Sequence, residues 1–178
     1  MFSVYTVCFF GHRVIADFQS AESAVERIIA EVIDKHEFVE FLVGREGDFD
    51  QIVTSTVIRY KKNHNAGNCS LTWVMPYMKA DYTHNQESYD NYYDCVEVCE
   101  QSAQAHPKAA IQIRNRAMID RSDRCVFYVT KKSGSAYQSL KYAKRAAQKL
   151  LTLPKQKTNL KTPAKLNFCR GFSCDVYE

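Results

Sequence analysis

The feature that most constrains the fold of this chain is a regular alternation of short apolar segments with amphipathic ones. Five segments have the length and the β-branched or aromatic content of buried strands: residues 4–10, 38–43, 71–75, 125–129 and 150–153. The stretches between them carry apolar residues at helical spacing, which predicts helices over about 20–35, 49–57, 107–121 and 133–147. This alternation predicts right-handed βαβ units and hence a Rossmann-like α/β fold, a three-layer sandwich with a mostly parallel sheet of about five strands and helices on both faces.

The segment 77–106 interrupts this pattern and is crowded with tyrosines. We expect one helix in it, over about 96–105. The aromatic faces could hold an adenine or single-stranded bases by stacking. They could equally pack against the helical layer with their hydroxyls hydrogen-bonded, and the sequence leaves both interpretations open.

The chain has 178 residues, which is long enough for one well-buried core and short for two. We expect a single domain over 1–153. Most of the formal net charge of +4 comes from the Lys-rich segment 154–178, which we expect to be an extended or disordered basic tail. The rest is close to neutral, which argues against a nucleic-acid-binding protein that works through bulk charge.

The seven cysteines do not predict a disulfide scaffold. Their number is odd, Cys8 and Cys125 fall within predicted strands, and we expect no signal peptide. We therefore expect a reducing, cytoplasmic setting. The cysteine spacings are not those of a zinc site, so we assign no metal. No apolar stretch approaches the ~20 residues needed to cross a membrane, so we expect no membrane partner.

Three loops that follow predicted strands carry residues suited to an anionic ligand. They are Gly11-His12-Arg13, then Gly44-Arg45-Glu46-Gly47-Asp48-Phe49-Asp50, and then Lys131-Lys132-Ser133-Gly134-Ser135-Ala136. Ligands on parallel sheets bind at the carboxyl ends of the strands. We therefore expect the three loops to converge on one site.

Each loop also has a purely structural interpretation. Glycine lets a backbone approach a ligand and arginine presents a planar fork to phosphate, but both also occur in solvated turns. Amide groups at a helix start can bind an anion. Asp48 is placed to cap the second helix, and Ser133 or Ser135 could cap the last one.

The ordered set of motifs resembles the SLOG superfamily, which groups the Smf/DprA proteins with the LOG phosphoribohydrolases, and is most similar to its YpsA-like branch. The resemblance covers residues 4–153 and rests on Phe10-Gly11-His12-Arg13, Gly44-x2-Gly47-x2-Asp50, Arg114-Asn115-x2-Met118, Asp123, and Ser133-Gly134-Ser135-Ala136 with Tyr142-Ala143. It implies glycine loops that hold a nucleotide or an ADP-ribose-type ligand. It also implies that His12 and Arg13 lie beside this ligand and that Arg114 reaches its phosphate or ribose. Together with the loop residues, the predicted ligand-binding set is Gly11, His12, Arg13, Gly44, Arg45, Gly47, Asp50, Arg114, Asn115, Ser133, Gly134 and Ser135.

One departure from the family pattern bears on catalysis. LOG enzymes, which cleave the N-glycosidic bond of nucleoside monophosphates, carry Pro-Gly-Gly-x-Gly-Thr-x2-Glu after the equivalent strand. Here Gly134-Ser135-x2-Gln138 takes the place of Gly-Thr-x2-Glu. A glutamine cannot ionise to activate water or to stabilise positive charge. Our first hypothesis is therefore a nucleotide-binding sensor or carrier module, with no catalytic residue assigned.

Two other hypotheses remain. The second is a nucleotide N-glycosidase or phosphohydrolase whose acid is Glu46, Asp48 or Asp50. The third is DprA-like binding of single-stranded DNA, which the near-neutral body disfavours and the basic tail and tyrosines allow. Assembly into a homo-oligomer stays open.

Overall fold

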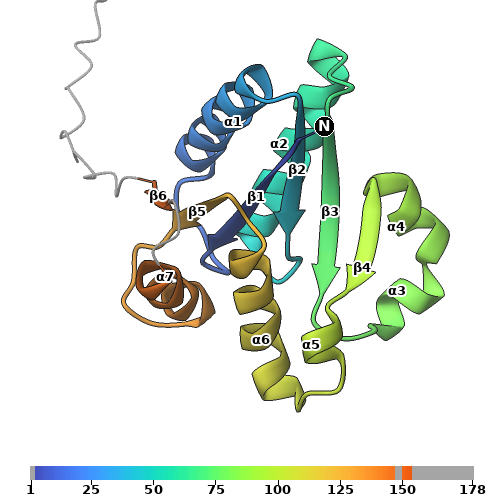
Figure 1. The fold of residues 1–178 in the computed structure, drawn as a ribbon, viewed down its shortest axis with the longest axis vertical. Helices are drawn as coiled ribbons and strands as arrows, with labels where there is room; N and C mark the ends of the chain where they lie inside the picture. Colours follow the sequence, from blue (N-terminus) through green and yellow to red (C-terminus); the bar gives the residue numbers. More distant parts are fainter. Residues whose placement is uncertain (1–2, 147–149, 154–178) are drawn as a thin grey trace, which may run out of the picture.

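The structure is a computed structural model that describes residues 3–146 and 150–153. Strands and helices alternate along the chain (Figure 1). The strands are β1 (Val4–Gly11), β2 (Phe38–Val43), β3 (Cys69–Met75), β4 (Cys95–Val98), β5 (Arg124–Tyr128) and β6 (Leu150–Thr152). The helices are α1 (Phe18–Lys35), α2 (Asp48–His64), α3 (Ala80–His84), α4 (Gln86–Tyr92), α5 (Glu100–Ala103), α6 (Pro107–Asp120) and α7 (Ser135–Arg145).

The strands form one six-stranded sheet in the order β4-β3-β2-β1-β5-β6, and every neighbouring pair is parallel. This confirms the predicted α/β Rossmann-like fold, with one strand more than expected. The chain runs outward from β1 in one direction as far as β4 and then returns to the other side of β1. The switch in strand order therefore lies between β1 and β5, where ligands of such sheets bind.

The extra strand, β4, corrects the predicted helix over 96–105. Asp94 fixes the start of β4, because its carboxylate accepts the amide of Leu71 at 2.7 Å and also pairs with Lys61 Nζ at 2.6 Å. At the other end the amide of Cys99 donates to the carbonyl of Met75 at 2.9 Å. Only Glu100–Ala103 is helical in the predicted range. The edge strand is half-buried, so its sequence lacks the apolar run by which we recognised the others.

Alternate side chains of the strands point to opposite faces of the sheet and pack into two separate hydrophobic cores. On β1, Val7 and Phe9 pack beneath α1 and α2, while Cys8 and Phe10 face the other layer, where Met118 of α6 lies. Val7, Cys8, Phe9 and Met118 are each at most 1 % exposed, and Phe10 is 6 % exposed. This alternation holds the central strand rigid on both faces, so that the loops after the strands start from fixed points.

Two helix starts differ from the sequence prediction. Asp48 does not cap α2, whose N-cap is Gly47; instead its carboxylate accepts the amide of Ile15 at 3.0 Å and ties the loop after β1 to α2. Helix α7 begins at Ser135 rather than at Ser133.

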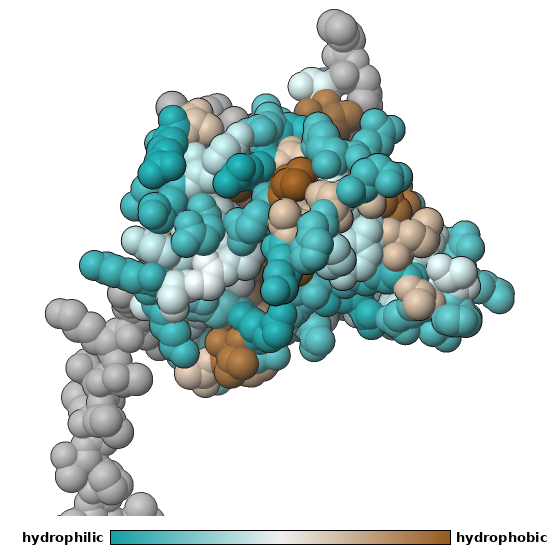
Figure 2. Space-filling model, turned by 90° about the horizontal axis from the view of Figure 1, so that it is seen from below, coloured by the Kyte–Doolittle hydropathy of each residue, from teal (hydrophilic) through white to brown (hydrophobic). Residues whose placement is uncertain are grey.

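No helix in the described ranges is long and apolar enough to cross a membrane. The tail predicted over 154–178 lies outside the described residues. Figure 2 views the molecule from below, toward which the arrowheads of β1, β2 and β3 point in Figure 1. Hydrophilic residues cover most of this face and hydrophobic ones form small patches, so the carboxyl edge of the sheet is a largely polar surface.

Candidate functional site

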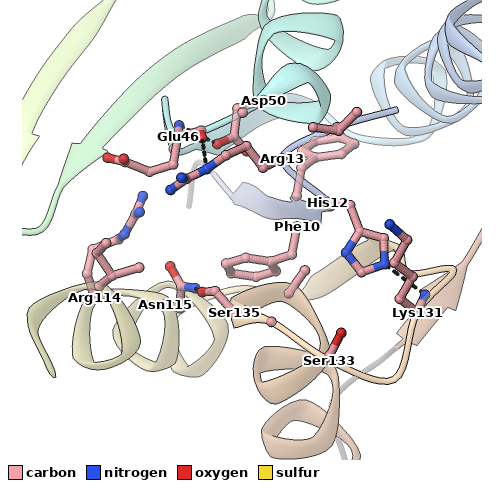
Figure 3. Close-up of a pocket in the computed structure, with 18 residues that line it drawn as sticks. Phe10, His12, Arg13, Glu46, Asp50, Arg114, Asn115, Lys131, Ser133 and Ser135 are labelled. Carbon is pink, nitrogen blue, oxygen red and sulfur yellow. Dashed lines mark hydrogen bonds between the residues drawn. The ribbon is translucent and has the colours of Figure 1, made fainter. Parts of the chain in front are cut away.

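A cavity of about 440 Å³ lies at the carboxyl ends of β1, β2 and β5 and is hereafter the glycine-loop cavity (Figure 3). The three loops singled out from the sequence all contribute to its lining, together with α6. Every predicted ligand-binding residue except Arg45 lines it: Gly11, His12, Arg13, Gly44, Gly47, Asp50, Arg114, Asn115, Ser133, Gly134 and Ser135. The cavity thus sits at the switch in strand order.

The first two loops touch through their backbones. The amide of Asp48 donates to the carbonyl of Arg13 at 2.9 Å. A Cβ added to Gly47 would lie 2.4 Å from Cα of Arg13, so no larger residue fits without parting the loops. The exposed side chain of Arg13 bridges them again, because its Nε donates to the carbonyl of Glu46 at 3.1 Å. These contacts fix one rim of the glycine-loop cavity.

The start of α7 forms the opposite rim. Gly134 precedes it with φ +85° and ψ 177°, a conformation that is nearly restricted to glycine. No side chain in the described part of the chain caps this helix. Ser135, one of the two predicted caps, instead accepts with its side-chain oxygen from the side-chain amides of Gln112 at 3.0 Å and Asn115 at 3.1 Å. The amide groups of the first turn therefore remain available to an anion in the cavity.

His12 holds the loop after β5 in place. Its Nε2 accepts the backbone amides of Thr130 and Lys131, both at 2.9 Å, which requires the proton of the neutral ring to be on Nδ1. Partial burial and the positive charge of Lys131 lower the pKa of His12. His12 thus lines the cavity as a neutral positioning residue.

Arg114 is a fixed charge in the inner wall. It is only 3 % exposed, and its Nη1 donates to the carbonyl of Val74 at 2.9 Å and lies 3.8 Å from Sδ of Met118. Its buried Nε has no hydrogen-bond partner among the residues described. Burial lowers the pKa of Arg114, and the carboxylates of Asp50 and Glu46 counteract this effect. In Figure 3 its guanidinium group and that of Arg13 both point into the cavity.

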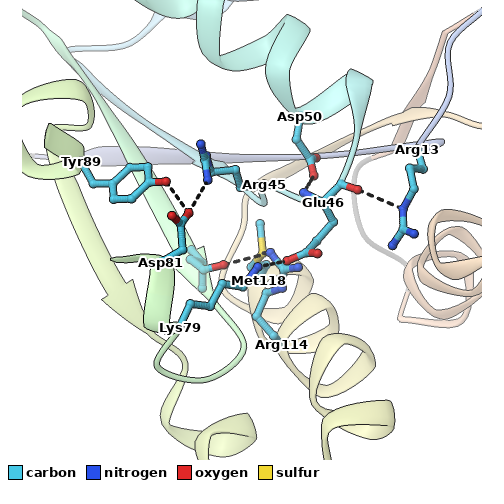
Figure 4. A network of polar contacts seen from close by, with 10 residues as sticks. Arg13, Arg45, Glu46, Asp50, Lys79, Asp81, Tyr89, Arg114 and Met118 are labelled. Carbon is cyan, nitrogen blue, oxygen red and sulfur yellow. Dashed lines mark hydrogen bonds and ion pairs between the residues drawn. The ribbon is translucent and has the colours of Figure 1, made fainter. Parts of the chain in front are cut away.

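Two carboxylates line the same wall and differ in environment (Figure 4). Asp50 accepts the amide of Glu46 at 2.8 Å, and burial raises its pKa against the effects of this bond and of Arg114. Burial would also raise the pKa of Glu46, but an ion pair with Lys79 outweighs it and lowers that pKa. Sequence reasoning missed Lys79 because nothing in the local pattern reveals a partner 33 residues away.

Gln138, which takes the place of the LOG glutamate in the sequence, is exposed on α7 and does not line the glycine-loop cavity. Asp48, the third candidate acid, does not line it either. Lys131, Phe10 and Ile111 do, although they were absent from the predicted set. Lys131 belongs to one of the three loops singled out from the sequence, so its position in that loop could have indicated that it lines the cavity.

Arg45 lies in a different cavity, of about 730 Å³, hereafter the tyrosine cavity. Its guanidinium carbon is 4.6 Å from the ring centroid of Tyr89 and 5.6 Å from that of Trp73, and its Nη1 pairs with Asp81 at 3.2 Å. In Figure 4, Arg45, Asp81 and Tyr89 lie together on one side of Glu46, and Arg13 lies on the opposite side of Glu46. Arg45 therefore lies apart from the other predicted site residues, and its role in ligand binding stays a prediction.

Among the described residues no three His, Cys, Asp or Glu side chains are grouped so that they could hold a metal ion. The charged side chains that line the glycine-loop cavity are Arg13, Arg114 and Lys131, together with Glu46 and Asp50.

No protein-family model matches the sequence, and no curated protein does so. Solved structures of two DNA processing proteins are similar to this chain in fold. DNA processing protein A (DprA) from Streptococcus pneumoniae has a TM-score of 0.65 and 11 % identity, and the match covers 88 % of this chain and 52 % of that one. DprA from Helicobacter pylori, whose structure describes a single-stranded DNA binding mode, has a TM-score of 0.61 and 13 % identity over 86 % of this chain and 67 % of its own. This chain therefore spans about half the length of the first and shares with both a Rossmann-like fold.

Proposed function

We propose that this chain binds a nucleotide or a nucleotide derivative in the glycine-loop cavity, with a phosphate at the start of α7. The observation that carries the proposal is the uncapped first turn of α7, which meets the cavity together with the side chains of Arg13, Arg114 and Lys131. A helix N-terminus stabilises negative charge, and charge-assisted hydrogen bonds from arginine add to it.

The remaining lining favours a nucleotide over a bare anion. A volume of about 440 Å³ exceeds the needs of one phosphate and lies in the range of small-molecule sites. Phe10 and Ile111 supply apolar surface, while Asn115 and Asp50 supply polar groups that suit sugar hydroxyls.

We further propose that the chain is a cytoplasmic member of the SLOG superfamily, close to its YpsA-like branch. The ordered sequence motifs support this, and so does the fold that the chain shares with two DprA proteins.

We propose binding without turnover. Gln138 carries no charge and lies outside the cavity lining, and Glu46 is neutralised by Lys79. Asp50 is the one lining carboxylate without an ion pair in the described ranges, and it is the residue that an enzymatic function would use. Incubation with nucleoside monophosphates, followed by chromatography, should release no free base. Release that Asp50→Asn abolishes would establish the hydrolase instead.

The binding test is calorimetric titration with AMP and with adenosine. Arg13→Ala should weaken AMP binding about tenfold at low salt, since a hydrogen bond to a charged group contributes ~1.5–3 kcal/mol and exposure reduces it. Adenosine binding should change little. Arg116→Ala is the matched control, because Arg116 is exposed on α6 and does not line the cavity. Absence of AMP binding to the unmodified chain would refute the proposal.

Single-stranded DNA is the second candidate ligand, favoured by the DprA of Helicobacter pylori, whose structure describes such binding. Exposed Arg13, Lys131 and Lys132 lie on the loops around the cavity and could contact successive phosphates. A labelled oligothymidylate that binds at least a hundredfold more tightly than TMP, and that AMP displaces, would favour DNA over a mononucleotide.

A further inference from the structure

We propose that the tyrosine cavity is a second binding site, for a planar heteroaromatic ring of about the size of a purine. The cavity of about 730 Å³ opens between the first turns of α1, helix α2 and helix α4. Sites for small molecules typically have volumes of ~300–1,000 Å³. The site requires no ligand in the glycine-loop cavity, with which it shares one lining residue, Asp50.

One wall of the tyrosine cavity is aromatic. Tyr89 and Tyr93 are held by Trp73, with ring centroids 5.1 and 5.5 Å away, and Tyr92 meets Tyr93 edge-on at 5.1 Å. Tyr92 remains 49 % exposed, and Phe18, which lines the cavity from α1, is 51 % exposed. Two large rings on different elements thus leave apolar surface in water at the same cavity. A flat ligand would cover both rings and gain from stacking on them.

The other wall is polar, and most of its polar side chains are uncharged. Helix α2 contributes Gln51, Thr54 and Ser55, and the chain around α4 contributes Asn85 and Ser88. Their amides and hydroxyls offer both donors and acceptors. A ring with nitrogen and exocyclic polar groups at its edge satisfies such a wall, whereas a hydrocarbon ring would leave it without partners.

Of the three charged side chains that line the tyrosine cavity, Glu22 and Arg45 are paired, and the third, Asp50, accepts the amide of Glu46. Glu22 bonds to Arg59, and Arg45 pairs with Asp81. Asp81 also accepts the hydroxyl of Tyr89, which fixes the guanidinium of Arg45 over that ring. A planar guanidinium in a fixed orientation is itself a surface on which aromatic rings stack. The site therefore suits a neutral ring more than an ionised one.

Adenine is the probe, because it is planar and neutral and lacks both phosphate and sugar. Trp73 is the sole tryptophan and contacts two rings of the cavity, so its emission reports occupancy. Adenine should change this emission saturably. Tyr92→Ala and Phe18→Ala should each weaken adenine binding roughly tenfold, as removal of a stacking ring does elsewhere. Both side chains are half exposed, so these variants should fold.

Tyr142→Ala is the matched control, since Tyr142 packs on α7 against Arg116, away from the tyrosine cavity. Arg13→Ala should leave adenine binding unchanged. Neither Tyr92 nor Phe18 lines the glycine-loop cavity, so a loss of adenine binding in their variants separates this site from that cavity. Calorimetry measures the same affinities without relying on emission. Unchanged affinity in both Tyr92→Ala and Phe18→Ala, a loss in Arg13→Ala, or no saturable binding of adenine would each overturn the proposal. Adenine binding without AMP binding would uphold this site while refuting the proposed function.

Discussion

Replacement of Gly134 by alanine isolates the effect of one backbone angle. A Cβ at Gly134 would meet nothing within 4 Å, so the substitution adds no clash, and its cost comes from the φ of +85°. A non-glycine residue in this region costs ~1–3 kcal/mol. For a chain of this size each kcal/mol lowers the melting temperature by about 2–4 °C, which predicts a loss of about 2–12 °C.

Gly67→Ala provides the control. A Cβ there would also meet nothing within 4 Å, but the φ of Gly67 is not in the positive region. This variant should be neutral or stabilised by up to ~1 kcal/mol, because alanine restricts the unfolded chain. Thermal denaturation followed by circular dichroism gives both values. Equal melting temperatures of the two variants would show that Gly134 neither holds the strained conformation nor orients the start of α7.

A second readout links this backbone angle to function. If Gly134→Ala relaxes φ toward negative values, the amide groups at the start of α7 turn away from the cavity. AMP should then bind more weakly to Gly134→Ala than to Gly67→Ala. Equal AMP affinity in the two variants would show that the phosphate is held elsewhere.

Three further predictions test other contacts. Gly47→Ala should lower the free energy of unfolding by ~1–3 kcal/mol in urea denaturation, because its Cβ would collide with Cα of Arg13. Since the pKa of His12 is lowered on folding from 6.5, folding favours the neutral ring; stability should fall as the pH drops below about 6.5 and level off below the lowered pKa. His12→Ala should remove that part of the pH profile of the melting temperature. Truncation after residue 153 should change the melting temperature by no more than a few degrees, since the Lys-rich tail cannot bury much apolar surface.

Periodicity predicted most of the fold because five of the strands lie within continuous apolar runs. The sixth, β4, has four residues at the edge of the sheet and is held by the carboxylate of Asp94 and the carbonyl of Met75. Both contacts join segments more than twenty residues apart, so a local sequence pattern cannot predict them.

The candidate site likewise has features that the sequence predicts and features that it does not. The glycine loops could be brought together from the sequence because each follows a parallel strand, and parallel strands end at one edge. The separation of Arg45 from its neighbours in the loop depends on Tyr89 and Asp81, which belong to the irregular segment 77–106. The burial of Arg114 likewise depends on a carbonyl of β3 that lies 40 residues away.

The central place of β1 also has a consequence for synthesis on the ribosome. One edge of β1 pairs with β2, which follows soon afterwards, but its other edge pairs with β5. The amide of Thr6 donates to the carboxylate of Asp123, 117 residues away, and the amide of Asp123 returns a bond of 2.8 Å to Thr6. A nascent chain that has formed β1 to β4 therefore presents an open, apolar strand edge, which invites pairing with other chains. The docking of β5 onto β1 closes this edge.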